Sequence, residues 1–433
     1  MKQKYFLLLI FGLFVLRIVY GVVSEFWGED ELQIYLIGLK SYTTGTWPYF
    51  GPDIVYTNTQ IPGALQGLLV SAPLYILSIP EAPMIFLGIL SFASLSLLAT
   101  YISKRFSDIP KWLIWTIVLT TTWVMHFSTR VVNPSYVLLF SIPFFISFLE
   151  IIEVYKDAFM KKGLAFFTMG IATTLVMQIH MSWVLLLPFT GFAFLYLLKN
   201  TPKHFIKYGV FYVLGALIGA ATLIPTLFYN DPHGTGNVGS NIKFVWENIQ
   251  NIPVILTRFL SFAAYEIPYM IGTNTDLRLE LIQRNIWMAP FTAFLYIVGF
   301  AQVALFIIGF FQKNETSEWK KIKWITFSSY ILIFLSFFFS IKGPSPHTFY
   351  IMLPIAMIYS FYCYRWLLSK KEIWGRLLKA VAISGISFHI FLGIDSYFTK
   401  SVYKDRDRVQ EAIDKKDYKI LGTRRSDDWG HGY

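Results

Sequence analysis

Three consecutive acidic residues, Glu29, Asp30 and Glu31, follow shortly after the first long apolar run of this 433-residue chain. Carboxylates this close together repel one another, so at least one of them is expected to have a raised pKa. A carboxylate of that kind suits general-base catalysis or metal binding. The alternative is a solvated acidic loop that helps to set membrane topology, and the residues alone leave both interpretations open.

Isolated basic residues stand at other boundaries between apolar runs, on the side where Lys and Arg are rare. Arg130, followed by Asn133, could hold a phosphate with its planar fork of N–H donors, or could snorkel to an interface. His180 could bind a metal ion, donate to a phosphate or cap a helix. The other basic residues of this side could together form a cationic surface for an anionic lipid head group. They are Lys243, Arg258, Arg278, Arg284, Lys342, His233 and His347.

The composition predicts that membrane-spanning helices position these residues. The chain is 55% hydrophobic and only 15% charged, whereas a soluble domain carries roughly 25% charged residues. The net charge of +11 is spread over short loops, which indicates membrane topology and not nucleic-acid binding. The single cysteine, Cys363, excludes a disulfide framework and a Cys-based metal site. The sequence contains no P-loop, dinucleotide fingerprint, HExxH or GxSxG motif.

The apolar runs predict an all-α polytopic transmembrane helical bundle, because about 20 apolar residues are needed to cross a bilayer. Between the first two runs, Glu31–Tyr42 has apolar residues at helical spacing, which is typical of an interfacial helix. The runs lie at about 5–23, 61–79, 83–101, 112–128, 135–152, 164–179, 181–198, 209–228, 286–311, 324–341, 348–368 and 378–395.

Basic residues in alternate connections predict which loops face the cytoplasm. Six such groups hold 20 of the 37 Lys and Arg residues, and they place the N-terminus inside and the C-terminal tail outside. Three runs precede the basic loop at 104–111, although this topology requires an even number of crossings there. We therefore expect 11 or 13 spans. One membrane domain is predicted at 1–395, with outer loops at 24–60 and 229–285, and a short outer tail at 396–433.

Several short motifs resemble the GT-C superfamily of membrane glycosyltransferases, in the style of the protein O-mannosyltransferases and the aminoarabinose transferase of lipid A. The first is the pair Asp30-Glu31 beyond the first span, followed by an interfacial helix and the sequences Gly45-Thr46-Trp47-Pro48 and Gly51-Pro52-Asp53, the latter expected to form a turn. The second is Arg130-x-x-Asn133-Pro134, with Gln178-Ile179-His180 further on. The third is the span start Phe349-Tyr350-(x)3-Pro354.

The resemblance implies an inverting sugar transfer from a polyprenyl-phosphate-linked donor on the outer face of the membrane. In that reaction Asp30 would deprotonate the acceptor hydroxyl, and Glu31 would orient the acceptor or a metal ion. The leaving phosphate would be held by Arg130 and by Arg258, Arg284 or His347. Some relatives use a divalent metal ion, to which Asp53 or His180 would contribute, with Asn133 as a further acceptor contact.

The resemblance also implies a multi-pass protein of a bacterial or archaeal plasma membrane, a role in the cell envelope, and no nucleic-acid partner. The acceptor would be a glycan, a lipid or a protein side chain. A transporter or flippase of a lipid-linked saccharide is the alternative function. Charged residues inside the apolar runs are few, and Arg17 and Glu150 lie near run ends, which argues against an ion-coupled transporter.

Overall fold

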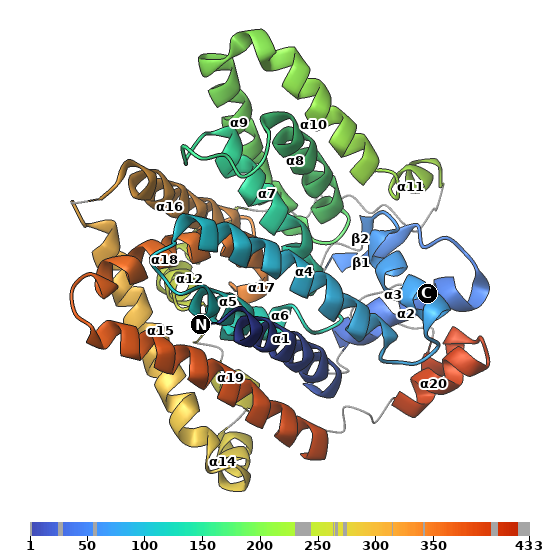
Figure 1. The fold of residues 1–433 in the computed structure, drawn as a ribbon. Helices are drawn as coiled ribbons and strands as arrows, with labels where there is room; N and C mark the ends of the chain where they lie inside the picture. Colours follow the sequence, from blue (N-terminus) through green and yellow to red (C-terminus); the bar gives the residue numbers. More distant parts are fainter. Residues whose placement is uncertain are drawn as a thin grey trace. The chain divides into compact units, whose positions relative to one another are not determined.

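The protein, represented by a computed structural model, is helical almost throughout (Figure 1). The chain forms two compact units, and each is built from separate stretches of sequence. The first unit comprises residues 1–24, 92–127 and 244–400, and the second comprises 25–91, 128–243 and 401–433. The residues described by the structure are 2–24, 29–54, 59–229, 244–262, 264, 267–271, 275–313, 315–340, 343–399 and 406–422.

Helix α4 contributes residues to both units. Its bounds are Ala82–Arg105. The other helices of the first unit are α1 (Gln3–Ser24), α5 (Lys111–Thr120), α6 (Thr122–Phe127), η5 (Trp246–Asn251), α12 (Ile252–Leu260), α13 (Ile267–Ile271), α14 (Thr275–Arg284), α15 (Met288–Phe310), α16 (Ser317–Phe337), α17 (Pro346–Phe349), η7 (Tyr350–Met352), α18 (Leu353–Leu368) and α19 (Ile373–Thr399).

The second unit holds the strands and the remaining helices. Its elements are α2 (Glu29–Thr44), β1 (Phe50–Ile54), β2 (Thr59–Pro62), α3 (Leu65–Ile76), η1 (Asn133–Tyr136), α7 (Val137–Ile151), α8 (Lys162–Met177), η2 (Met181–Leu186), α9 (Leu187–Asn200), η3 (Pro202–His204), α10 (Phe205–Gly219), α11 (Ile224–Phe228), α20 (Arg406–Asp414) and η9 (Tyr418–Leu421).

Seven helical segments among the described residues are long and apolar enough to cross a membrane, which confirms the prediction of an all-α bundle of membrane-spanning type. They are Gln3–Ser24, Ala82–Arg105, Asn133–Ile151, Met181–Asn200, Met288–Phe310, His347–Leu368 and Ile373–Thr399. The total of 11 or 13 spans stays a prediction. Helix α3, in the apolar run 61–79, has only 12 residues and is about 18 Å long, whereas a bilayer core is about 30 Å thick. Helix α3 is therefore shorter than the thickness of a bilayer core.

The apolar run 112–128, expected as one helix, is broken in the first unit. Helix α5 ends at Thr120, and Thr121 adopts an extended conformation with φ −58° and ψ 143° before α6 begins. The Thr120 hydroxyl donates to the carbonyl of Thr116 at 2.7 Å, a side-chain bond that competes with regular helix geometry. The buried Arg17 guanidinium donates to the carbonyl of Leu119 at 2.8 Å. Arg17 therefore provides a hydrogen-bond donor to a carbonyl group in the last turn of α5, where carbonyl groups lack partners within the helix.

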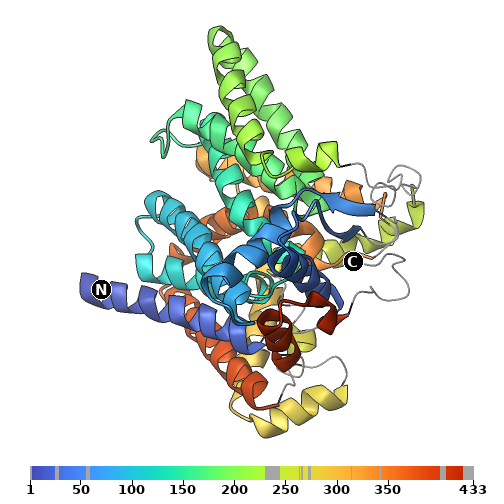
Figure 2. The ribbon, with the colours of Figure 1, turned by 90° about the vertical axis from the view of Figure 1, so that its right-hand side faces the viewer.

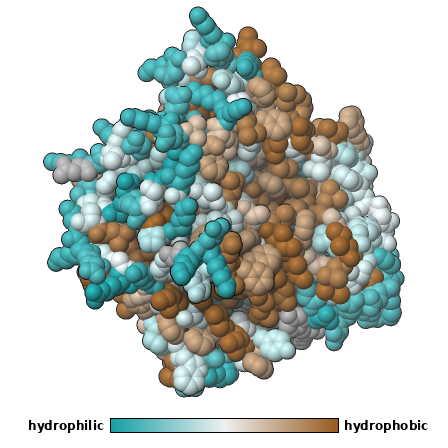
Figure 3. Space-filling view, viewed as in Figure 1, coloured by the Kyte–Doolittle hydropathy of each residue, from teal (hydrophilic) through white to brown (hydrophobic). Residues whose placement is uncertain are grey.

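Helices α8 and α10 of the second unit lie side by side (Figure 1). A side chain on Gly170 would collide with the carbonyl of Tyr212, and one on Gly215 with the carbonyl of Phe167. Small residues of this kind let membrane helices approach closely. Exposed apolar side chains occur on both α9 and α10, and Figure 3 shows an apolar surface along α10 below a hydrophilic tip. This surface suits contact with lipid.

Helix α2 is confirmed where the interfacial helix was predicted, but its surroundings differ from those of a helix lying on a membrane. Tyr35 and Leu39 are fully buried, and polar neighbours such as Gln33 are buried as well. The helix contacts α3, β1 and two elements of the C-terminal tail, α20 and η9 (Figure 2).

The predicted turn at Gly51-Pro52-Asp53 is wrong, because these residues belong to strand β1. Strand β1 pairs with β2 in an antiparallel sheet in which Phe50 faces Pro62 and Asp53 faces Gln60. The register shifts between Phe50 and Asp53, where Pro52 lacks the N–H group that a regular ladder needs. An irregular two-stranded edge tolerates proline, so the chain continues as a strand.

Candidate functional site

The acidic residues lie at the start of α2, where helix dipoles favour negative charge. Asp30 is exposed and Glu31 is buried. Glu29 is helical, and residues 25–28 lie outside the described residues. The two neighbouring carboxylates therefore occupy different environments. Asp30 is accessible to a substrate, whereas Glu31 points into the second unit.

Glu31 forms an ion pair with Arg130, the isolated basic residue before η1. The side chain of Glu31 is only 4% exposed and that of Arg130 is 19% exposed. Burial raises the pKa of Glu31, the charge of Arg130 opposes that shift, and the neighbouring charge of Asp30 adds to it. The fold thus brings together three residues that the sequence analysis selected, from positions about 100 residues apart.

Asp53 lies close to the same helix, because its carboxylate accepts a hydrogen bond of 2.6 Å from Gln33. Gln33 follows Glu31 by two residues and was not anticipated as a site residue. Gln66, in the first turn of α3, is fully buried, and neither atom of its amide has a hydrogen-bond partner among the described residues. Gln66 could have been marked in advance as a glutamine inside the apolar run 61–79, whereas Gln33 lies in the predicted outer loop, where a polar residue is ordinary.

Asn133 and His180 both make hydrogen bonds near the connection between α8 and η2 in the second unit. The Asn133 amide donates to the carbonyl of Ile179 at 3.4 Å. His180 is the N-cap of η2, where its Nδ1 accepts from the Ser182 amide at 3.1 Å. Gln178, fully buried, donates to the carbonyl of Gly219 at 2.8 Å. Of the three roles considered for His180, helix capping is therefore the one seen in the structure.

The remaining predicted phosphate ligands belong to the first unit. Arg258 donates to the carbonyl of Pro344, in the turn that leads to His347. The ring of His347 lies 6.2 Å from that of Phe127. Arg284 is engaged by Asp395, with its Nε 3.3 Å from the carboxylate, and by Glu280 at 2.6 Å. Phosphate binding by Arg258, Arg284 and His347 stays a prediction. Lys243, His233 and Lys342 lie outside the described residues.

A metal site is not assembled in the part of the chain that the structure describes, where no three His, Cys, Asp or Glu residues form a group that could hold an ion. The chemistry available at α2 is therefore that of an exposed carboxylate beside a buried ion pair.

The interpretation of this site rests on the residues described above, because comparisons with known proteins add no match. No protein-family model, curated protein or solved structure matches the chain.

Proposed function

We propose that the chain is an inverting glycosyltransferase that moves a sugar from a polyprenyl-phosphate-linked donor to an acceptor hydroxyl on the outer face of the membrane. The observation that carries the proposal is the exposed Asp30 carboxylate beside the buried Glu31–Arg130 ion pair, with Asp30 six residues beyond the end of α1 in the sequence. This arrangement sets an accessible proton acceptor next in sequence to a buried carboxylate that holds a positive charge.

In the proposed reaction Asp30 takes the proton of the acceptor hydroxyl as its oxygen attacks the anomeric carbon. The bond from that carbon to the phosphate oxygen breaks, and the polyprenyl phosphate leaves with the electron pair. Attack opposite the leaving group inverts the configuration. Arg130 carries five N–H donors on a planar fork, and Glu31 fixes the orientation of that fork. A preplaced guanidinium of this kind stabilises the charge that develops on the phosphate.

Glu31 is a positioning residue in this mechanism. Its carboxylate is buried against Arg130, so it does not reach an acceptor in solvent as Asp30 does. The resemblance gave Glu31 a direct contact with the acceptor or a metal ion, and its burial favours a role through Arg130 instead.

The test replaces Asp30 with Asn. Each variant is expressed in cells from which the native gene has been deleted, and surface glycans and lipids are measured by mass spectrometry. We expect the product to fall at least 100-fold with normal amounts of protein in the membrane, because a general base contributes about 10²–10⁴-fold. Asp276→Asn is the matched control, since Asp276 is also exposed and is also the second residue of its helix. Wild-type product levels in Asp30→Asn would contradict the proposal.

A transporter or flippase of a lipid-linked saccharide is the second candidate, and one observation favours it. The break between α5 and α6, together with the fully buried Arg17, places an interrupted helix and a cation inside the first unit. Transporters use both features in their binding sites. Reconstituted liposomes separate the two functions, because transport moves a labelled sugar lipid between leaflets without forming a new glycosidic bond.

A further inference from the structure

One end of the first unit carries nearly all of the excess positive charge of the chain. Four segments of the sequence, 2–4, 104–111, 313–323 and 365–379, together hold 14 basic and 4 acidic residues, a net charge of +10, whereas the whole chain carries +11. Five of the seven candidate spans begin or end in these segments or next to them. The excess charge is therefore concentrated at a set of helix ends.

Three side-chain contacts bring these segments together, because each joins an element that begins or ends in one segment to an element of another. The contacts are Phe6 to Trp115, with 5.7 Å between ring centroids, Arg365 Nε to the Asp108 carboxylate at 3.1 Å, and Trp319 to Tyr362, with stacked rings 6.0 Å apart. The four segments thus form one surface of the first unit, the basic end.

Three of the four acidic residues at the basic end form ion pairs with basic residues of the same end. They are Asp108, Glu315 and Glu372, whose partners are Arg365, Lys323 and Arg376. The excess charge falls on exposed lysines, which include Lys4, Lys111, Lys320, Lys370, Lys371 and Lys379. Like charges gathered at one end repel one another, and an anionic partner offsets that repulsion. The basic end is therefore suited to binding anions.

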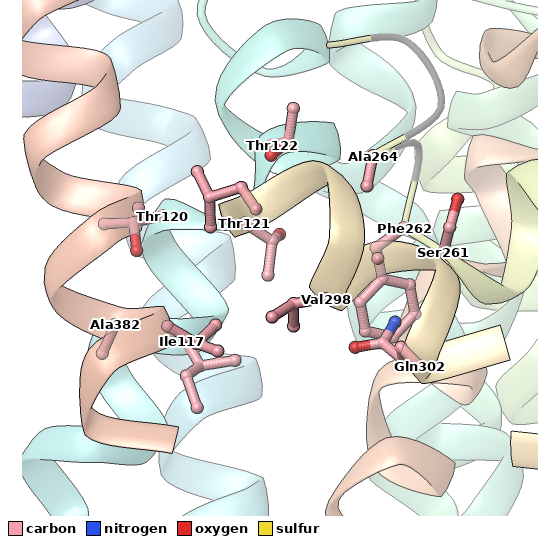
Figure 4. Close-up of a pocket in the computed structure, with 14 residues that line it drawn as sticks. Ile117, Thr120, Thr121, Thr122, Ser261, Phe262, Ala264, Val298, Gln302 and Ala382 are labelled. Carbon is pink, nitrogen blue, oxygen red and sulfur yellow. The ribbon is translucent and has the colours of Figure 1, made fainter. Parts of the chain in front are cut away.

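Helix α5 leads from the basic end to a small pocket beside the break between α5 and α6 (Figure 4). Lys111 begins the helix, and Thr120 at its other end lines the pocket. The pocket holds about 60 Å³, whereas small-molecule sites measure roughly 300–1,000 Å³. It is too small for a phospholipid, so the surface at the basic end is the part of α5 that suits one.

Tryptophan residues interleave with the basic residues and indicate which kind of anion lies here. Six of the 13 tryptophans are in the basic segments or next to them, Trp112, Trp115, Trp319, Trp324, Trp366 and Trp374. Trp324 is 50% exposed, and Lys370 Nζ lies 5.7 Å from the centroid of the Trp366 ring. Tryptophan is enriched at the level of lipid head groups, and basic residues at that level attract anionic lipids. Helix ends, tryptophans and lysines together favour a lipid over a soluble polyanion.

We propose that the basic end of the first unit is a binding surface for anionic phospholipids, whose phosphate groups lie against Lys320, Lys370 and Lys371 while their acyl chains lie along the neighbouring apolar helices. The surface selects its lipids by charge, so it differs from a site for one donor lipid at Arg130. The proposal does not rest on sugar transfer, and it stands or fails separately from Asp30.

The experiment places the full chain in lipid nanodiscs and follows tryptophan fluorescence, which brominated acyl chains quench on contact. Brominated phosphatidylglycerol is compared with brominated phosphatidylcholine at increasing mole fractions. At about 0.1 M salt we expect the anionic lipid to quench about five-fold more effectively, as for one basic residue near an anionic surface. At about 1 M salt the screening length falls to about 3 Å, and the difference should largely disappear. Equal quenching by the two lipids at the lower salt concentration would overturn the proposal.

The double variant Lys370→Gln, Lys371→Gln tests the assigned surface, because both lysines are exposed between α18 and α19. Its preference for phosphatidylglycerol should fall about two-fold or more, since the other cations of the basic end remain. The matched control is Lys415→Gln, Lys419→Gln, two exposed lysines of the tail, where residues 406–422 hold five basic and four acidic residues. The control should keep the wild-type preference, and equal losses in the two variants would contradict the assigned surface.

A soluble polyanion provides the last comparison. Polyuridylic acid added in excess at about 0.1 M salt should leave the quenching by brominated phosphatidylglycerol unchanged, because lipid head groups occupy the basic end at the bilayer surface. Loss of the difference between the two lipids in its presence would show that the surface takes a soluble polyanion, and the proposal would be wrong.

Discussion

Each compact unit contains a buried carboxylate that pairs with an arginine, and the two carboxylates are held differently. Asp395 of the first unit accepts from Arg284, from the Asn285 amide at 2.6 Å and from the Thr399 hydroxyl at 3.1 Å. Glu31 of the second unit pairs with Arg130 and has a second acid directly before it in the helix. Asp395 is part of a hydrogen-bonded network that ties α14 to α19, whereas the charge balance around Glu31 depends on one guanidinium.

The two carboxylates show how a structural ion pair differs from one at a candidate functional site in this molecule. A carboxylate with several neutral donors keeps partners when one of them is lost. Burial raises the pKa of Glu31, whose charge is balanced by one cation, and its neighbour Asp30 remains accessible. Perturbed acids beside accessible ones are typical of functional sites, although structural networks also perturb them.

The largest expected effect is on stability when each arginine is removed. Arg130→Met should lower the free energy of unfolding by about 3 kcal/mol, because it leaves Glu31 buried without its cation. Arg284→Met should cost only about 1 kcal/mol, since the Arg284 side chain is 38% exposed and Asp395 keeps Asn285 and Thr399. Unfolding in mixed detergent micelles would measure both losses. Equal losses would remove the distinction between the two pairs.

The pH dependence of stability gives a smaller effect that belongs to Glu31. Burial raises its pKa above the usual 4.5, so the folded state binds this proton more tightly than the unfolded state does. The stabilising contribution is complete below pH 4.5 and is lost as the pH rises through the raised pKa, with a slope of at most about 1.4 kcal/mol per pH unit. Glu31→Gln should abolish this part of the pH dependence when unfolding is followed across the window.

Glu280→Gln is the control for that measurement, because the Glu280 side chain is 60% exposed and pairs with Arg284 only at the surface. It should retain the pH dependence of the wild type. A Glu31→Gln protein with the wild-type slope would show that another group carries it.

The sequence predicted the helical elements well because apolar runs must be covered by lipid or protein wherever they lie. All twelve runs contain helix, and the acidic pair at Asp30 and Glu31 begins α2. The proximity of Glu31 to Arg130 was proposed only through the resemblance, as two members of one site. Their direct pairing is a tertiary contact that the spacing along the chain does not encode.

Other features could not be predicted from local sequence. Residues 111–127 contain neither Gly nor Pro, so nothing but three consecutive threonines hinted at the break at Thr121. Threonine is both β-branched and able to bond its hydroxyl to the preceding turn, which weakens a helix only slightly. Tertiary contacts then decide the outcome, and here Arg17 stabilises the end of α5. Pro52 likewise fits inside strand β1 because, among the described residues, the sheet has only two strands and β1 has a strand partner on one side.

The smallest predicted effect concerns the C-terminal tail, whose docking on the second unit the sequence did not predict. Arg406 pairs with both carboxylate oxygens of Glu81, which lies 325 residues earlier, and Val409 and Ala412 of the same helix are fully buried. Arg406→Gln should therefore lower the free energy of unfolding by about 1 kcal/mol, since the Arg406 side chain is one-third exposed. Arg376→Gln, which removes an exposed pair with Glu372 in the first unit, should change stability by less than about 0.5 kcal/mol. Detergent unfolding of both variants provides the comparison, and equal losses would mean that the tail pair contributes no more than a surface contact.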